Sequence, residues 1–127
     1  MGLFKKRNKA SKNRISTNVP WNQLEQMEQL EEINQMSKTK KIIIFKHSTR
    51  CGISSMVLDQ FESQYDILED EIIPFYLDLL RYRPLSDAIA KAYEVVHQSP
   101  QLLLIENGQC VHHASHYDIQ VASLKND

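Results

Sequence analysis

The sequence predicts an α/β fold, a mixed four-stranded sheet flanked by helices with an additional helix near the N-terminus. Segments with helical spacing of apolar residues alternate with short β-branched runs, in the order helix, strand, helix, strand, helix, strand, strand, helix. The first two strands are separated by a helix, which indicates a parallel pair with a crossover. The last two are separated by Asn107-Gly108, a two-residue hairpin turn, which indicates an antiparallel pair.

The composition is that of a globular protein with a single domain. The chain has 127 residues, of which 42% are hydrophobic and 24% charged. No apolar run approaches the roughly 20 residues that a bilayer span needs, and the first residues lack the apolar stretch of a secretory signal. We therefore expect a cytoplasmic protein that does not enter a membrane.

The charges divide the chain into two parts. Residues 1–20 contain six basic side chains and no acidic one, and they are expected to form a disordered tail, whereas residues 21–127 form the folded domain. A basic tail can contact nucleic acid or anionic lipid. This tail lacks aromatic residues at regular spacing and an amphipathic stripe, so no nucleic-acid partner is expected.

Four elements are predicted in the first half of the chain. Residues 42–45 form a β-branched run suited to a strand buried on both faces. Residues 52–64 show apolar side chains three and four apart, which is typical of a helix. Residues 72–77 form a second strand, and Pro74 within it favours an edge or end position. Before these, a helix is expected from Asn22 onward because apolar residues recur at every third position: Leu24, Met27, Leu30, Ile33 and Met36.

The second half completes the pattern with a helix, a hairpin and a terminal helix. The helix begins at Pro84 and its apolar stripe extends to Val96. The hairpin strands lie near 102–105 and 109–113, and a last helical stripe covers 117–124. A mixed four-stranded sheet with helices on both faces, in this order, is the architecture of the thioredoxin-like fold.

Cys51 is the candidate reactive residue. It lies where the loop after the first predicted strand becomes a helix, next to Arg50 and Gly52. Unpaired N–H groups and the positive end of the helix dipole favour a thiolate there, and Arg50 adds a positive charge. Because the thiolate is the nucleophile of disulfide exchange, this position predicts a redox-active thiol. The alternative is a buried cysteine that serves only as a small apolar residue.

The neighbouring residues predict chemistry with a single thiol. A dithiol enzyme would carry a second cysteine three residues after the first, where this chain has Ser54. The Ser54 hydroxyl can bond the Cys51 thiolate or make local helix contacts, but it cannot resolve a disulfide. Cys110 follows the hairpin turn at the far end of the sheet, about 16 Å away along the strand. A disulfide requires Cα atoms within about 7 Å, so Cys110 is expected to be a core residue opposite Ile105.

Two further groups of residues are expected near this site. Pro100 comes just before the third strand, where the thioredoxin architecture has a cis-proline facing the cysteine, with Ser99 offering backbone hydrogen bonds to substrate. His47 and His97 are expected in loops at the same end, where either could contact the thiolate or a ligand. The histidines that follow the hairpin are not expected to bind metal, because adjacent strand residues face opposite ways and no acid or cysteine completes the set: His112, His113 and His116.

These motifs together resemble the YtxJ-like monothiol bacilliredoxins, over about residues 21–124. The resemblance is carried by five separated motifs in the correct order: His47-Ser48-Thr49-Arg50-Cys51-Gly52-Ile53-Ser54, Asp78-Leu79 with Tyr82-Arg83, Leu85-Ser86 with Ile89-Ala90, His97-Gln98-Ser99-Pro100-Gln101, and Ser115-His116 with Ile119. Many relatives have threonine and proline where this chain has Arg50 and Gly52.

The resemblance implies a thioredoxin-like enzyme that removes bacillithiol from proteins protected as mixed disulfides. Cys51 would be its reactive cysteine and Pro100 its cis-proline, with bacillithiol as co-substrate, bacillithiolated proteins as partners and no bound cofactor or metal. Bacillithiol carries an anionic malate, and basic residues near the site could contact it: Lys46, Arg50, Arg81 and Arg83.

Two other functions remain open at this point. The Cys-Gly-Ile-Ser string is similar to the Cys-Gly-Phe-Ser motif of monothiol glutaredoxins, which carry iron–sulfur clusters with the help of a thiol cofactor. The other is a binding or regulatory domain that kept the fold without catalysis. A visible spectrum with charge-transfer bands that depend on Cys51 would favour the cluster, and failure of Cys51 to form a thiol adduct would favour the binding domain.

Overall fold

The computed structural model describes residues 18–125, so the first 17 residues of the predicted tail lie outside the described chain. The folded part begins before the expected boundary at residue 21. Val19 is buried, and the side-chain amide of Asn18 donates a hydrogen bond to the backbone oxygen of Tyr65. The contacts of these two residues place them in the domain rather than in the tail.

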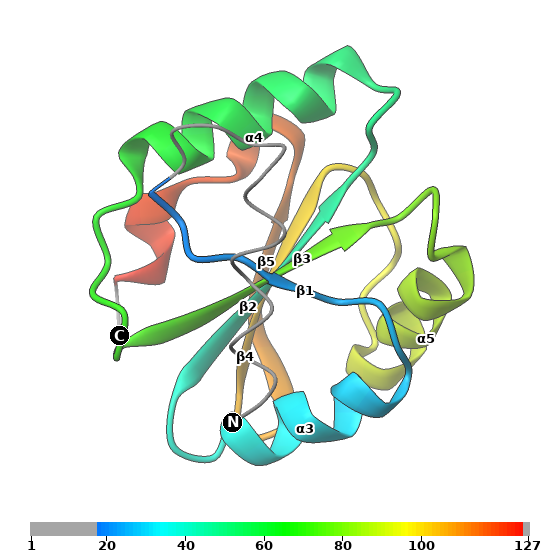
Figure 1. Ribbon diagram of the computed structural model, residues 1–127, viewed down its shortest axis with the longest axis vertical. Helices are drawn as coiled ribbons and strands as arrows, with labels where there is room; N and C mark the ends of the chain where they lie inside the picture. Colours follow the sequence, from blue (N-terminus) through cyan, green and yellow to red (C-terminus); the bar gives the residue numbers. More distant parts are fainter. Residues whose placement is uncertain (1–17, 126–127) are drawn as a thin grey trace.

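A five-stranded mixed sheet forms the centre of the molecule, in the order β1-β3-β2-β4-β5 (Figure 1). β1, β3 and β2 are parallel, and β4 and β5 continue the sheet as antiparallel strands. The strands are β1 (Asn22–Gln23), β2 (Lys41–His47), β3 (Ile72–Asp78), β4 (Gln101–Glu106) and β5 (Gln109–Ser115). Within residues 18–125 the helical elements are α3 (Glu28–Met36), α4 (Gly52–Gln64), α5 (Arg83–Tyr93) and two short 3-10 helices, η2 (His116–Asp118) and η3 (Val121–Leu124).

The largest correction concerns the segment after Trp21, which was expected to be helical from Asn22. Asn22 and Gln23 instead form a short fifth strand beside β3, and the helix starts only at Glu28. Asn22 donates its side-chain amide to the backbone oxygen of Pro74, and the Leu24 N–H donates to that of Tyr76. These tertiary hydrogen bonds override the apolar spacing of three, whose first two members lie outside the helix.

β3 is consequently not an edge strand, although it contains Pro74. β1 pairs only with Phe75 and Tyr76, so the side of β3 that faces β1 needs no N–H from Pro74. The chain also differs from expectation at its C-terminal end, where two 3-10 helices replace the predicted terminal helix. α5 ends at Tyr93 because Glu94 adopts a left-handed conformation that caps it, which leaves Val96 outside the helix.

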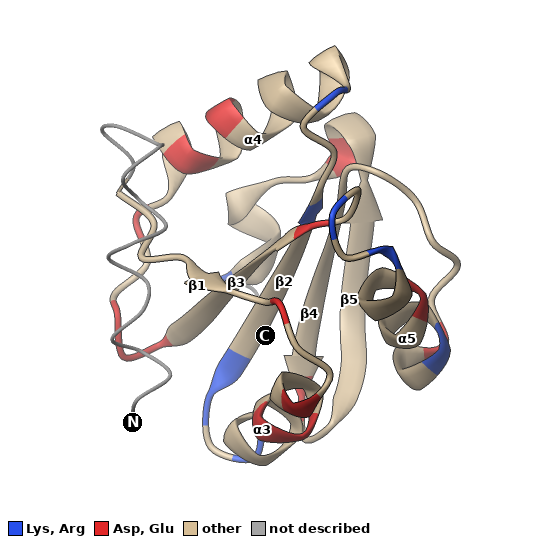
Figure 2. Cartoon of the chain, turned by 45° about the vertical axis from the view of Figure 1, so that its right-hand side comes forward, with Lys and Arg blue, Asp and Glu red and all other residues tan. Residues whose placement is uncertain are grey.

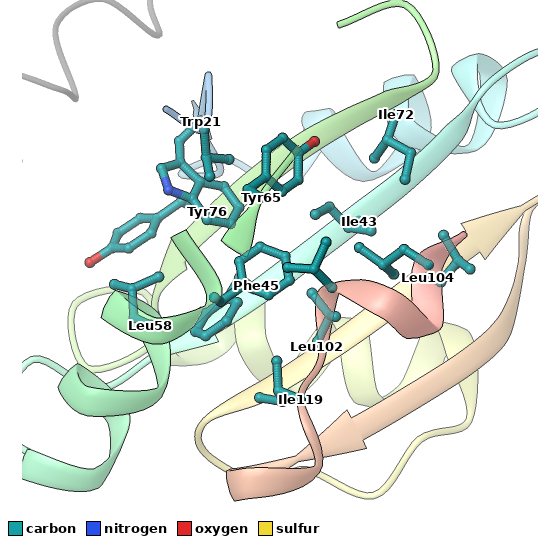
Figure 3. Packing of buried hydrophobic residues seen from close by; sticks show 14 of the residues in the cluster. Trp21, Ile43, Phe45, Leu58, Tyr65, Ile72, Tyr76, Leu102, Leu104 and Ile119 are labelled. Carbon is teal, nitrogen blue, oxygen red and sulfur yellow. The ribbon is translucent and has the colours of Figure 1, made fainter. Parts of the chain in front are cut away.

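The core consists of two layers, one on each face of the sheet. Alternate residues of β2 point to opposite faces, so Ile43 and Phe45 pack towards α4, whereas Ile42 and Ile44 pack towards α3 and α5. β4 alternates in the same way. Figure 3 shows the α4 layer, in which Phe45 of β2, Leu58 of α4 and Ile119 from the C-terminal part of the chain belong to one cluster of buried residues. The run of four apolar residues in β2 is therefore buried on both faces, as the sequence predicts.

Candidate active site

Cys51 is the N-cap residue of α4, directly after the loop that leaves β2. Its backbone is extended, its N–H donates to the Ser48 oxygen at 3.2 Å, and its own carbonyl accepts from Ser55 at 3.1 Å. Cys51 is partly exposed. The first turn of α4 contains no acidic residue, so no carboxylate there opposes a negative charge on the sulfur. The structure thus places the thiol at the helix start that the sequence predicts.

Ser54 is a buried residue bonded to the end of β2. Its Oγ accepts a hydrogen bond from the Ser48 N–H at 3.0 Å and lies 2.7 Å from His47 Nδ1. Of the two roles considered for Ser54, the structure shows the local one. These bonds join the first turn of α4 to β2 and so fix where Cys51 stands relative to the sheet.

Replacing Ser54 by alanine is expected to lower the free energy of unfolding by about 1–3 kcal/mol, because the Ser48 N–H and His47 Nδ1 lose the hydroxyl while buried. Urea unfolding followed by the fluorescence of Trp21 measures this change. Ser55→Ala, at an exposed position of the same helix, is the control and is expected to stay within about 0.5 kcal/mol of the wild type. Equal stabilities of the two variants would contradict a stabilising role for the Ser54 hydrogen bonds.

His47 does not lie in a loop, contrary to expectation. It is the last residue of β2 and is 3% exposed, with its ring directed to the α4 face, where it contacts Ser54 and the Tyr76 ring. The expected loop at 47–50 therefore starts one residue later. His47 supports the first turn of the helix instead of standing open to a ligand.

Pro100 follows a cis peptide bond from Ser99 and immediately precedes β4. Lys46 pairs with Gln101 in the antiparallel register, so one further step sets Pro100 opposite His47. Pro100 is buried, and its carbonyl accepts a hydrogen bond from His116 at 3.0 Å. The Ser99 Oγ is buried and has no hydrogen-bond partner among residues 18–125. Ser99 and Pro100, before the start of β4, thus lie at the same end of the sheet as Cys51, after the end of β2.

Cys110 lies at the opposite end of the sheet, as expected. It pairs with Ile105, which in turn pairs with Ile42 at the start of β2, whereas Cys51 follows the end of that strand. Cys110 is partly buried, its Sγ contacts the His112 carbonyl at 3.3 Å, and burial raises the pKa of its thiol. Five residues of strand span about 16 Å, beyond the reach of a disulfide.

The basic residues considered as ligand contacts divide into two groups. Arg50, Arg81 and Arg83 are exposed, and Arg81 lies over the Tyr82 ring at 5.6 Å. Figure 2 shows basic segments before α4 and at the start of α5, both at the same end of the sheet. Lys46 differs because it is fully buried. The three arginines are therefore accessible to a ligand, whereas the buried Lys46 is not.

Lys46 is part of a polar cluster that the sequence reasoning missed. Its ammonium donates to the Ser86 carbonyl at 3.2 Å and to His97 Nδ1 at 3.3 Å, and Ser86 Oγ lies 3.2 Å from the same nitrogen. Burial lowers the pKa of Lys46 to about 8, with Asp87 opposing the shift. Burial and the Lys46 charge also lower the pKa of His97. The pattern was visible in the sequence, since Lys46 continues the alternation of Ile42 and Ile44 towards the α5 face.

The buried Lys46 predicts an unusual dependence of stability on pH. Its native pKa of about 8 lies below the 10.5 of the free side chain, so the unfolded chain binds more protons between these values. Stability relative to Lys46→Met should therefore rise by about 2 kcal/mol from pH 7 to pH 10. Urea unfolding of both proteins across this range measures the difference, and a difference that is flat or falls with pH would contradict it.

One cavity lies away from this site. This cavity of about 720 Å³ opens at the other end of the sheet, between the loops that follow α3, α4 and β4. Among residues 18–125, no three His, Cys, Asp or Glu side chains lie together as metal ligands would. Within the same residues, no helix has both the length and the apolar character needed to cross a bilayer.

Comparison with known proteins places this chain in a family. The family model described as monothiol bacilliredoxin BrxC matches residues 22–124, which include Cys51 and Pro100. The chain belongs to the monothiol bacilliredoxin family. A solved structure of a thioredoxin-fold protein, provisionally described as an oxidoreductase, is 36% identical, with a TM-score of 0.68 over 80% of this chain and 88% of that one. The family and this neighbour support a thiol redox function.

More distant structures show the fold alone. Thioredoxin of Malassezia sympodialis has a TM-score of 0.66 at 15% identity, over 88% of this chain and 90% of that one. Thioredoxin of Fasciola hepatica has a TM-score of 0.60 at 18% identity, over 81% and 91%. The predicted thioredoxin-like fold is thereby confirmed for this chain, with five strands rather than four.

Proposed function

We propose that this bacilliredoxin removes bacillithiol from bacillithiolated proteins through a mixed disulfide on Cys51. The observation that supports the proposal is that no second thiol of residues 18–125 lies near Cys51. Ser54 stands where a resolving cysteine would be and is bonded to His47 and Ser48, and Cys110 lies at the far end of the sheet. A disulfide formed on Cys51 has no thiol in reach, within residues 18–125, to break it from inside.

The reaction consists of two exchange steps with no net oxidant. The Cys51 thiolate attacks the bacillithiol sulfur of the substrate disulfide, and the substrate cysteine leaves as a thiolate that takes up a proton. A free low-molecular-weight thiol, as its thiolate, then attacks the bacillithiol sulfur of the Cys51 disulfide, forms a disulfide with bacillithiol and releases Cys51 as a thiolate. Cys51 at the helix start supplies the nucleophile, while Ser99 before Pro100 offers backbone groups to the substrate.

The exposed arginines give the proposed site a basic rim. Arg50 precedes Cys51 after the end of β2, and Arg81 and Arg83 follow the end of β3, which pairs with the end of β2. Guanidinium groups bind carboxylates with two parallel hydrogen bonds. This rim supports a thiol ligand that carries carboxylates, such as bacillithiol, and no bound cofactor is needed.

The proposal is tested with a protein bearing one bacillithiol on a known cysteine. Incubation with catalytic amounts of the bacilliredoxin and an excess of free bacillithiol is expected to remove the adduct many-fold faster than free bacillithiol alone. Intact mass of the substrate over time gives the rate. A rate equal to that of the free thiol would refute the proposal, and absorption bands dependent on Cys51 in protein purified without oxygen would favour a cluster carrier instead.

A further inference from the structure

Lys46 directly follows the apolar run 42–45 of β2, and its side chain is completely buried beneath α5. Its ammonium bonds to neutral groups, the carbonyl of Ser86 and the ring nitrogen of His97. Burying a charge in this way costs stability, and replacing it with a well-packed apolar residue is often neutral or stabilising. Stability alone therefore does not explain a lysine at this position.

The contacts of Lys46 lead to the segment that carries Pro100. A lysine ammonium can only donate, so His97 Nδ1 accepts and the ring is held neutral with its proton on Nε2. Gln101, which pairs with Lys46 across β2 and β4, donates its side-chain amide to the Val96 carbonyl at 2.9 Å. Two side chains on one face of the sheet thus hold the residues just before Ser99 and Pro100.

The next residue of β2 makes the corresponding contact on the other face. His47 lies towards α4 and bonds to Ser54, in the first turn of the helix that Cys51 caps. Lys46 and His47 are consecutive, and strand residues alternate between faces. The end of β2 is therefore bonded on one side to the helix of the thiol and on the other to the segment of the cis-proline.

We propose that Lys46 is a positioning residue that, through His97, holds segment 96–100 at a fixed place relative to Cys51. The inference rests on the proposed exchange function, in which the backbone of Ser99 binds the substrate disulfide. It assigns Lys46 no contact with the substrate. Displacing such a segment by about 1 Å can lower a rate by up to roughly 100-fold.

Lys46→Met tests the inference, with Lys91→Met as the matched control because Lys91 is an exposed lysine of α5. Lys46→Met is expected to lower the exchange rate of Cys51 with a bacillithiolated protein by at least about tenfold. Alkylation of Cys51 by iodoacetamide, which does not use segment 96–100, is expected to stay within about twofold of wild type. The urea midpoint of Lys46→Met at pH 7 is expected to be no lower than that of the wild type.

A second pair of variants tests the same contact without altering Lys46. The side-chain oxygen of asparagine can accept a hydrogen bond close to where His97 Nδ1 does, whereas leucine cannot. His97→Asn is therefore expected to keep most of the exchange rate, and His97→Leu to show the same loss as Lys46→Met. This pair decides the question if Lys46→Met fails to fold.

The outcomes separate this inference from the proposed function. If the wild type exchanges but Lys46→Met and His97→Leu do so equally fast, Lys46 has no positioning role. If alkylation falls in parallel with exchange, Lys46 acts on the Cys51 thiol itself and the inference is also overturned. If the wild type itself shows no exchange, the proposed function fails first.

Discussion

Cys51→Ser is expected to reduce exchange with a bacillithiolated protein to the rate without enzyme, whereas Cys110→Ser is expected to keep the wild-type rate. A serine hydroxyl at the helix start cannot form a disulfide, so nothing remains to accept the bacillithiol sulfur. Cys110 contacts the His112 carbonyl at the other end of the sheet and has a raised thiol pKa, which makes it the poorer nucleophile.

The two cysteine variants form a matched pair, since each removes one sulfur and adds one hydroxyl. Rates are taken from the intact mass of the substrate protein at several enzyme concentrations. Urea unfolding of both variants shows that each is folded. A Cys110→Ser variant as inactive as Cys51→Ser would mean that both thiols take part, which contradicts single-thiol chemistry.

Phe45→Ala is expected to lower the free energy of unfolding by about 3–5 kcal/mol, a large part of the about 5–15 kcal/mol that a domain has in total. Phe45 is fully buried, with its ring 5.9 Å from that of Trp21 and 5.5 Å from that of Phe61. Its removal leaves a cavity under α4, because the neighbouring rings belong to other elements, are fixed there by their own contacts and do not move in to fill the space. Trp21 in particular donates to Glu62 at 2.7 Å.

Trp21 is the sole tryptophan of the chain, so urea unfolding followed by its fluorescence reports on this layer directly. Leu68→Ala provides the control, because Leu68 is 65% exposed and its truncation is expected to change stability by less than about 0.5 kcal/mol. A loss below about 1 kcal/mol in Phe45→Ala would show that this ring does not hold α4 on the sheet.

The elements that the sequence predicted correctly are those whose local pattern agrees with their tertiary role. The run from Ile42 to Phe45 is β-branched or aromatic and is buried on both faces, and Asn107-Gly108 forms the hairpin turn, with both residues at positive φ. The prediction for the segment after Trp21, by contrast, was wrong. The apolar spacing of this segment is compatible with a helix, and only the hydrogen bonds to β3, which depend on the folded sheet, make it a strand.

The same distinction applies to the candidate site. The helix start at Cys51 and the proline before β4 follow from the order of the elements, and both stand where the sequence places them. The hydrogen-bond partners of Lys46 and His47 do not follow from the order of the elements. They depend on the sheet face to which each side chain points and on the residues that lie next to that face in the folded structure. A lysine directly after a buried apolar run was the one indication in the sequence of a polar cluster below the surface.

The most direct test of the proposed function is the mass of this protein itself after brief incubation with a bacillithiolated protein, followed by peptide mapping. Exchange through a single thiol predicts a gain of one bacillithiol located on Cys51, absent in Cys51→Ser and reversed by added free thiol. An adduct on Cys110, or no adduct while the substrate keeps its bacillithiol, would contradict it.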